Sequence, residues 1–252
     1  MERWWGPIPW QSKDINGVTN FLNDTLMGRP IAFLLATAYT DSLIWKYKNN
    51  FNNDIRNSIY NVQRTYYYTN PASKFFGKAI TKTNCDASTV NLWLQRTSPH
   101  FKKFVSAVHY HKFQDATSKE WHDNGRTYKD WYIMRLAETY LLRAEANMLK
   151  GDNASAANDI NAVRNRASAT PVTAGDVNME LILDERAREL YGEEFRLNTL
   201  LRTGTLIDHL TKYNWYFKEN NIAFNPSWKL FPIPRREIEA NTGAILEQNP
   251  GF

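Results

Sequence analysis

Two helical patterns separated by a single glycine constrain the fold of this chain more than any other feature. The first pattern lies between Trp131 and Leu149, where apolar residues recur at steps of three and four positions. One apolar stripe consists of Met134, Ala137, Leu141, Ala144 and Met148, and the stripe beside it consists of Ile133, Leu136 and Tyr140. Two adjacent stripes make a wide apolar face, which is typical of a helix packed between neighbours.

The second pattern follows directly after Gly151, and glycine is a residue that commonly ends helices. Asp152 or Asn153 can cap the helix that comes next. Its apolar positions are Ala156, Ile160, Val163 and Ala167. Because the connection is so short, the two patterns together predict an antiparallel helical hairpin.

This hairpin resembles one tetratricopeptide (TPR) unit, with alanines at positions 144 and 146, where two helices approach closely. One such repeat cannot bury both faces of its hairpin, and about three repeats are needed for stability. A further helix is predicted from roughly 178 to 197. We expect the other repeats to be degenerate, or to lie in an N-terminal half of the protein that this chain does not include.

The first 130 residues have a different character, because turn-forming glycine, proline and asparagine residues interrupt them frequently. Short helices are predicted around 31–47 and 54–67, and a strand around 103–113. The expected fold is therefore mostly α, a TPR-like helical scaffold with a large irregular, loop-rich, ligand-presenting portion. We assign 1–130 to the irregular portion and 131–252 to the helical portion and its C-terminal tail.

The charge and the apolar stretches exclude several functional classes. The formal net charge of +5 is modest, and no run of Arg and Lys exceeds two residues, so nucleic acid is not an expected partner. The longest apolar stretch, Ile31 to Tyr39, is much shorter than the roughly 20 residues of a membrane-spanning helix. The first residues of this chain, with Glu2, Arg3 and the pair Trp4-Trp5, are not expected to form a signal peptide. The lone Cys85 excludes an internal disulfide and is expected to be a buried thiol.

Three glutamates, Glu185, Glu189 and Glu193, share one face of the predicted helix 178–197, so paired-carboxylate glycoside hydrolysis has to be considered. On that face the order Arg186, Glu189, Glu193, Arg196 gives each glutamate an arginine neighbour at helical spacing. Ion pairing favours the ionised carboxylate and works against a general acid. We therefore interpret these four residues as a structural ion-pair helix, with no catalytic residue.

Metal and cofactor chemistry have no support in the sequence. His109 and His111 would share one face of a strand and His122 follows later, but no nearby cysteine and no HExxH motif completes a zinc pattern. No GxSxG, P-loop or GxGxxG motif is present. The chain is therefore predicted to be no enzyme, to bind no metal and to need no cofactor.

Aromatic residues make up 14% of the chain, and large flat side chains are suited to binding the apolar faces of sugar rings. Several lie among turns, where a rigid scaffold can present them to a ligand. Core packing is favoured for Trp45 and for the run Tyr66–Tyr68, although Tyr67 is kept as a candidate. The candidate ligand contacts are Trp4, Trp5, Trp10, Trp93, Tyr39 and Tyr67.

Five separated segments, in order, resemble the SusD/RagB family of nutrient-binding lipoproteins. They are DIRNS at 54–58 with Asn61 and Arg64, RLAETYLLRAEA at 135–146 with Asn161 to Ala167, ERAREL at 185–190 with Glu193 to Gly204, FPIP at 231–234, and QNPGF at 248–252. The resemblance covers roughly 50–252. Thr199 and Leu201 depart from the residues that the family often has there, Asp and Arg, which puts local ion pairing in doubt.

The resemblance implies a non-catalytic protein that captures oligosaccharides and delivers them to a SusC-type TonB-dependent transporter. It also implies a longer protein at the outer surface of a Bacteroidetes outer membrane, anchored by a lipid on an N-terminal part that is absent here. In such proteins exposed aromatics stack on glycan rings. One alternative is a peptide ligand, as in RagB-like relatives. A second alternative is a TPR scaffold that binds only proteins.

Overall fold

The computed structural model describes residues 6–21, 32–104, 113–114, 117, 121–122 and 132–252. These residues belong to two compact units, one that extends to Glu193 and one from Glu194 to Phe252. Helices predominate, and each of the strands among the described residues is two residues long. The predicted change at about residue 130 is thus a change of local character that lies within the first unit.

The predicted helical hairpin is formed by α4, Leu136–Leu149, and α5, Asn153–Arg166. Gly151 has a φ of 84°, a left-handed conformation in which a side chain would be strained. The Asp152 carboxylate accepts a hydrogen bond of 3.0 Å from the backbone of Ser155 and so caps α5. The sequence thus sets both the end of one helix and the start of the next.

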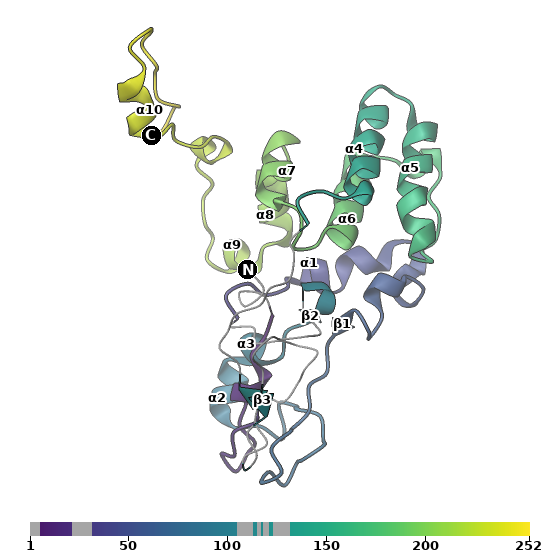
Figure 1. Ribbon diagram of the computed structural model, residues 1–252, viewed down its shortest axis with the longest axis vertical. Coiled ribbons are helices and arrows are strands. Elements are labelled where there is room, and N and C mark those ends of the chain that lie inside the picture. Colours follow the sequence, from purple (N-terminus) through teal and green to yellow (C-terminus); the bar gives the residue numbers. More distant parts are fainter. Residues whose placement is uncertain (1–5, 22–31, 105–112, 115–116, 118–120, 123–131) are drawn as a thin grey trace. The chain divides into compact units, whose positions relative to one another are not determined.

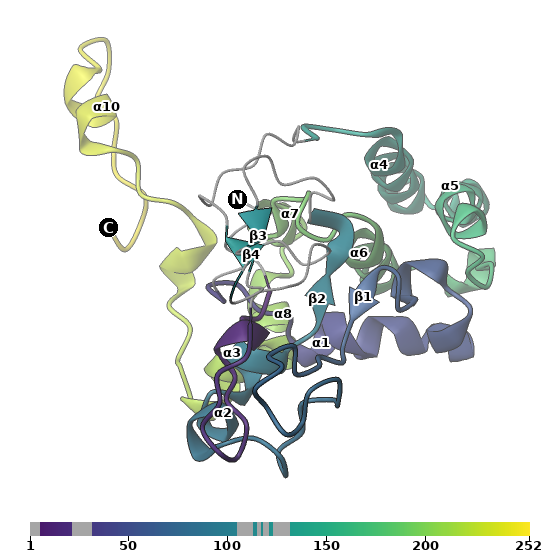
Figure 2. The ribbon, with the colours of Figure 1, turned by 60° about the horizontal axis from the view of Figure 1, so that its bottom comes forward.

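The core of the first unit lies between α4, α5 and α6, Met179–Glu189, which run side by side in Figures 1 and 2. The four apolar positions predicted for this helix are all buried, three of them within α5 and Ala167 at its C-terminal cap. The residues with no exposed surface in this core are Leu141, Ala144, Ala156, Ile160 and Ile182. Ala144 and Ala156 let the helices pack closely, whereas Ala146, also predicted at a contact position, is exposed.

Two boundaries differ from the prediction. The helix predicted from 131 begins only at Leu136, and Ile133 and Met134 before it are 95% and 62% exposed, so the first turn of both apolar stripes is not helical. The helix predicted at 178–197 is also wrong as one element. It ends at Glu189, and turns at 190–195 separate α6 from the next helix.

The loop-rich part of the first unit consists of short elements. They are η2 Pro9–Gln11, α1 Ala38–Asp41, η3 Leu43–Asn52, η4 Ile55–Asn57, β1 Val62–Gln63, α2 Ala87–Asn91, α3 Trp93–Thr97, β2 His100–Phe101, η5 Lys102–Phe104, β3 Phe113–Gln114, β4 Trp121–His122 and η6 Ala174–Asp176. The strand β1 pairs antiparallel with β2, and β3 pairs antiparallel with β4.

The helix predicted at 54–67 is wrong. The chain makes one 3-10 turn at 55–57, capped by the carboxylate of Asp54, and then continues in an extended conformation into β1. Pairing of Val62 with Phe101, far away in sequence, outweighs the weak local helical pattern. Most of the strand predicted at 103–113 lies outside the described residues.

A second, smaller core holds the loop-rich part together. It consists of Tyr66, Tyr68, Ile80 and Cys85, with Phe75, Val90 and Trp93 packed against it. Trp45 is also buried, with 2% of its surface exposed, so the prediction of core packing for Trp45, Tyr66 and Tyr68 is confirmed. Burial raises the pKa of the Cys85 thiol, as expected for an inert buried cysteine.

The second unit comprises five short helices among its described residues. They are α7 Arg196–Arg202, α8 Leu206–Tyr213, α9 Trp215–Glu219, η7 Pro226–Lys229 and α10 Arg235–Ala240. Its tail is closed by side-chain hydrogen bonds between two of the motifs noted above. The Gln248 amide accepts from the backbone of Ile233 at 2.8 Å and donates to its carbonyl at 2.9 Å. The Asn249 amide donates to the carbonyl of Phe231 at 2.7 Å.

Across the described part of the chain, every helix is too short or too polar to cross a membrane.

Candidate functional site

Tyr39 is the one described aromatic candidate that is fully buried. Only 7% of its surface is exposed, and its hydroxyl donates a hydrogen bond of 2.6 Å to the carboxylate of Asp184 in α6. A side chain committed to the junction of α1 and α6 has no face left for a ligand. The structure therefore corrects the placement of Tyr39 among the ligand contacts.

Trp10, Trp93 and Tyr67 come from three segments that meet in the loop-rich part. The turn η2, which holds Trp10, packs against α3, which begins at Trp93. The Asn20 amide donates to the carbonyls of Pro9 at 3.4 Å and of Tyr67 at 3.0 Å, and so ties the third segment to the first. Both tryptophans are half-buried.

The rings of Tyr67 and Trp93 do not share a surface. Trp93 packs against the core that contains Tyr66 and Tyr68, whereas Tyr67 is 52% exposed. Side chains alternate between opposite sides of an extended segment, so Tyr67 points away from its two buried neighbours. Tyr67 thus stays available to a ligand, and Trp93 is largely a packing residue.

Other candidates fall where the structure gives no account of them. Trp4, Trp5, His109 and His111 lie outside the described residues, as does the side chain of His122.

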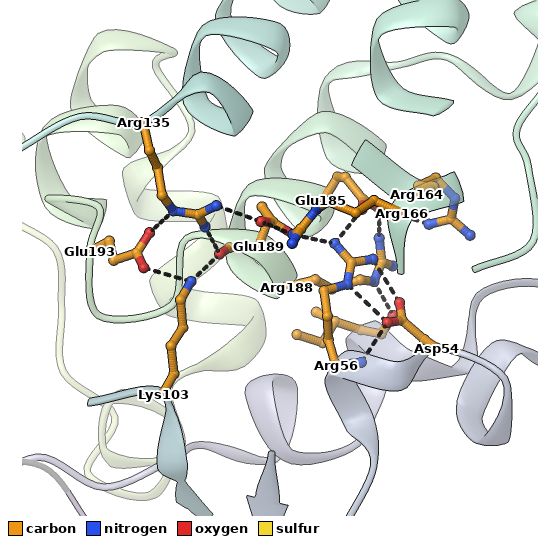
Figure 3. A network of polar contacts seen from close by, with 11 residues as sticks. Asp54, Arg56, Lys103, Arg135, Arg164, Arg166, Glu185, Arg188, Glu189 and Glu193 are labelled. Atoms are coloured by element: carbon orange, nitrogen blue, oxygen red, sulfur yellow. Dashed lines mark hydrogen bonds and ion pairs between the residues drawn. The ribbon is translucent and has the colours of Figure 1, made fainter. Parts of the chain in front are cut away.

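The charged residues of α6 form the most extensive polar network of the described structure (Figure 3). At its buried end lies Glu185, which has no exposed surface. Arg164 Nη1 and Arg188 Nη1 each lie 2.7 Å from its Oε2, and Arg56 Nη1 lies 2.9 Å from its Oε1. Asp54 shares Arg56, at 2.7 Å from Nη2.

Glu189, at the last position of α6, is the centre of the network (Figure 3). Its Oε1 accepts hydrogen bonds from Arg135 at 2.8 Å and from Arg166 at 2.6 Å, and its Oε2 accepts one from Arg56 at 2.9 Å. Its backbone carbonyl accepts from Arg135 and Lys103. Cations at the carboxyl end of a helix satisfy its last carbonyls and complement its dipole.

Glu193 forms the outer end of the network. It lies beyond α6, and its Oε1 is 2.8 Å from the ammonium of Lys103. Its Oε2 accepts a hydrogen bond from Nε of Arg135. Lys103 and Arg135 therefore each bridge Glu189 and Glu193, and they come from segments on either side of the residues between 104 and 132.

The residues predicted as one ion-pair helix are distributed differently. Arg186 is buried, and its Nη2 lies 3.2 Å from the carboxylate of Glu138 on α4. Arg196 belongs to the second unit, where it lies 3.4 Å from Glu194. Because α6 ends at Glu189, the helical spacing that linked these residues to Glu193 is absent. Apart from Arg188, which lies on α6 itself and contacts Glu185, the cations that hold the glutamates come from other elements.

The electrostatics of the network favour ionised carboxylates. Burial raises the pKa of Glu185, but the positive charges of Arg56, Arg188 and Arg164 outweigh this effect and lower its pKa to about 2. The pKa of Glu189 is lowered for the same reasons. A general acid has to hold a proton near neutral pH, and these glutamates do not. The arrangement is suited to holding elements together and to presenting charge.

A cavity of about 520 Å³ lies beside this network. Its cationic side chains are Arg56, Lys103, Arg135, Arg166 and Arg188, its carboxylates are Glu189 and Glu193, and its aromatic side chains are Trp45, Phe101, Tyr132 and Tyr191. The rings of Phe101 and Tyr191 stack with their centroids 4.0 Å apart, and Tyr132 is 60% exposed. The volume is within the range of roughly 300–1,000 Å³ that small-molecule sites occupy.

The network joins the sequence motifs that are far apart in the chain. Arg56 comes from the DIRNS segment, Arg135 from the start of α4, Arg166 from the end of α5, and Glu189 from the ERAREL segment. Comparison with protein families then decides the assignment, because residues 37–252 match the SusD family. This chain belongs to the SusD family.

Curated SusD-family relatives share 35% identity with parts of the chain. The starch-binding protein SusD of Bacteroides thetaiotaomicron matches over 154 residues, which are 59% of this chain and 27% of that protein. The SusD-like protein P25 of Formosa agariphila matches over 124 residues, 46% of this chain and 23% of that protein. The chain thus spans about a quarter of the length of these relatives.

Solved structures show the same fold at lower identity. A SusD superfamily protein from Bacteroides vulgatus has a TM-score of 0.53 and 23% identity, over 86% of this chain and 44% of that one. Another from Bacteroides fragilis has a TM-score of 0.50 and 19% identity, over 100% of this chain and 48% of that one. The predicted mostly helical, SusD-like fold is therefore confirmed.

SusD-family proteins are non-catalytic binding proteins, which agrees with the prediction that this chain is not an enzyme. Sequence reasoning quoted Arg56, Arg135 and Arg166 as motif residues but gave them no role. It missed Lys103 and Tyr132 altogether. Neither of these two residues has a local signal, because each gains its surroundings from segments far away in the sequence.

Proposed function

We propose that this chain is the ligand-binding part of a cell-surface protein that captures oligosaccharides without modifying them. The captured glycan would pass to a SusC-type TonB-dependent transporter in the outer membrane, with the lipid anchor on a part of the protein outside this chain. The observation that carries the proposal is membership of the SusD family over residues 37–252. The 35% identity to a starch-binding protein supports a glycan as the ligand class.

The geometry of the cavity beside α6 also supports the proposal. Exposed Tyr132 offers a flat apolar face of the kind that packs on a pyranose ring, and Arg166, 64% of whose side chain is exposed, offers hydrogen-bond donors for hydroxyl groups. A few polar groups around an apolar surface are typical of small-ligand sites. Tyr67 on the loop-rich part is a second exposed ring.

Calorimetry or affinity electrophoresis against a panel of polysaccharides and tryptic peptides tests this function. We expect one glycan class to bind, and we expect Tyr132→Ala to weaken that binding roughly tenfold, a change of about 1.4 kcal/mol. Tyr60→Ala is the matched control, because Tyr60 is 80% exposed and lies outside the cavity wall. Equal loss in both variants would place the ligand elsewhere.

A peptide ligand is the second candidate. The excess of cations over carboxylates in the cavity wall favours acidic peptides over neutral ones. Binding of peptides and of no polysaccharide in the same panel would establish this alternative.

The transporter partnership has its own test. We expect a tagged full-length protein, purified from gently solubilised outer membranes, to bring with it a large β-barrel protein. If the barrel is absent while glycan binding persists, the capture role stands and the delivery role is wrong. Capture of soluble proteins with no glycan binding would instead favour a protein-binding scaffold.

A further inference from the structure

The walls of the cavity beside α6 are unequally charged. They carry the five cationic side chains named above and two carboxylates, Glu189 and Glu193. Behind the wall the network adds the buried charges of Arg164, Asp54 and Glu185, and the half-buried charge of Asp184, which lies 3.7 Å from Arg188. The whole assembly then holds six cationic and five anionic side chains, so an excess of positive charge persists.

The two wall carboxylates are already occupied by cations. Both oxygens of Glu189 accept hydrogen bonds from guanidinium groups, and each oxygen of Glu193 contacts Lys103 or Arg135. A carboxylate held by several cations repels an incoming anion less than an isolated one, because its field is compensated at short range. The wall is therefore more favourable to an anion than the number of its acidic residues indicates.

One guanidinium group at the cavity, that of Arg166, keeps donors that the network does not use. Arg166 uses only Nη2 within the described structure, on Glu189, and 64% of its side chain is exposed. Arg188 also lines the cavity but is almost completely buried, with its Nη1 2.7 Å from Glu185 and its Nη2 3.7 Å from Asp184. Arg188 therefore adds positive charge to the wall, whereas the exposed guanidinium group of Arg166 can contact a ligand directly.

We propose that this cavity binds the anionic group of an acidic oligosaccharide, a carboxylate or a sulfate, with the guanidinium group of Arg166 as donor and the other cations of the wall as additional positive charge. Arginine is suited to such oxygens, because its planar fork forms parallel charge-assisted hydrogen bonds. Tyr132 then packs against the ring that carries the anionic group. This inference rests on the proposed glycan-binding function and names the class of glycan.

Calorimetry of the purified chain with matched glycan pairs tests the inference. Oligogalacturonate is compared with its methyl ester, and a sulfated galactan with its desulfated form, so that each pair differs only in the charged group and the two pairs separate carboxylate from sulfate. We expect at least a tenfold preference for the acidic form of one pair. We expect this preference to shrink at high salt, because screening weakens exposed charge interactions.

The substitution Arg166→Gln tests whether the preference for acidic glycans arises in this cavity. It should abolish most of the preference for the acidic form, so that the two members of a pair bind with nearly equal affinity. The matched control is Arg143→Gln, because Arg143 is 63% exposed in its side chain and also pairs with a carboxylate, that of Asp159, but lies outside the cavity wall. Circular dichroism verifies that both variants are folded.

The outcomes separate this inference from the function on which it rests. Binding of neutral glycans with no preference for the acidic form would keep the proposed function and overturn the inference. An acidic preference that survives Arg166→Gln would also overturn it, because the anion would then bind elsewhere. Binding of acidic peptides alone, or of nothing, would overturn both.

Discussion

Glu185 is a carboxylate without exposed surface, and it contacts the guanidinium groups of Arg56, Arg164 and Arg188. Moving one charge out of water is costly, and a buried charge persists only when its partners and hydrogen bonds compensate for that cost. Here the compensation is mutual, since the three arginines depend on the same carboxylate. The residue is therefore important for stability although it has no role in chemistry.

Glu185→Gln should destabilise the fold strongly, because it removes the counter-charge of buried Arg164 and one of the carboxylates that Arg56 and Arg188 contact. Breaking a buried ion pair from one side costs about 3–5 kcal/mol. Urea unfolding followed by circular dichroism measures the change. Glu239→Gln is the control, because Glu239 pairs with Arg235 at an exposed position and such pairs contribute roughly 0–1 kcal/mol. Equal stability of the two variants would contradict the structural role of Glu185.

At the scale of elements, the hairpin α4–α5 is the part that local sequence determines best. Its turn depends on Gly151, which adopts a φ of 84° without strain because glycine has no side chain. A Cβ at this position would meet no neighbouring atom within 4 Å. Any effect of a substitution at Gly151 is thus one of backbone strain and not of collision.

Gly151→Ala should lower the free energy of unfolding by about 1–2 kcal/mol, the cost of a left-handed conformation for an ordinary residue. The melting temperature and the urea midpoint both report this change. Gly175→Ala in η6 is the control, because Gly175 has no positive φ and its nearest side-chain atom is 3.8 Å from a built Cβ. There we expect a neutral or slightly stabilising effect. A neutral Gly151→Ala would mean that the turn can change its conformation.

Sequence predicted the elements that local rules control and failed where distant segments decide. The glycine turn and the apolar positions of α5 follow from spacing alone. The burial of Tyr39 depends on Asp184, which is 145 positions away, and the role of Lys103 depends on Glu193. The cavity is formed by segments distributed over much of the first unit, so no single sequence pattern could predict it.

At the scale of the whole molecule, the fold buries two titratable side chains in a single protonation state. His100 is buried as the neutral imidazole and Glu185 as the carboxylate. Burial, and secondarily the charge of Lys102, lower the pKa of His100 from 6.5 to about 4. Arginines lower the pKa of Glu185 from 4.5 to about 2. In each case the unfolded chain binds a proton more readily than the folded one, so protonation favours unfolding.

Stability should therefore fall in two stages on acidification. The first loss, of up to about 3 kcal/mol, is expected as the pH falls from 6.5 towards 4, because unfolded chains protonate His100 there. The second is expected as the pH falls from 4.5 towards 2 and the unfolded chain protonates Glu185. Urea midpoints between pH 7 and 3 measure both stages. A His100 ring that titrates near 6.5 by nuclear magnetic resonance would contradict the first.

The three arginines around Glu189 also bear on how the chain is made. Synthesis begins at the N-terminus, so Arg56 emerges from the ribosome long before Glu189 exists, and Arg135 and Arg166 follow in turn. Asp54, two residues from Arg56, can hold its guanidinium during that interval. Glu189 is synthesised after these three arginines, and its contacts join their segments. The first unit therefore completes its assembly only when α6 has been translated.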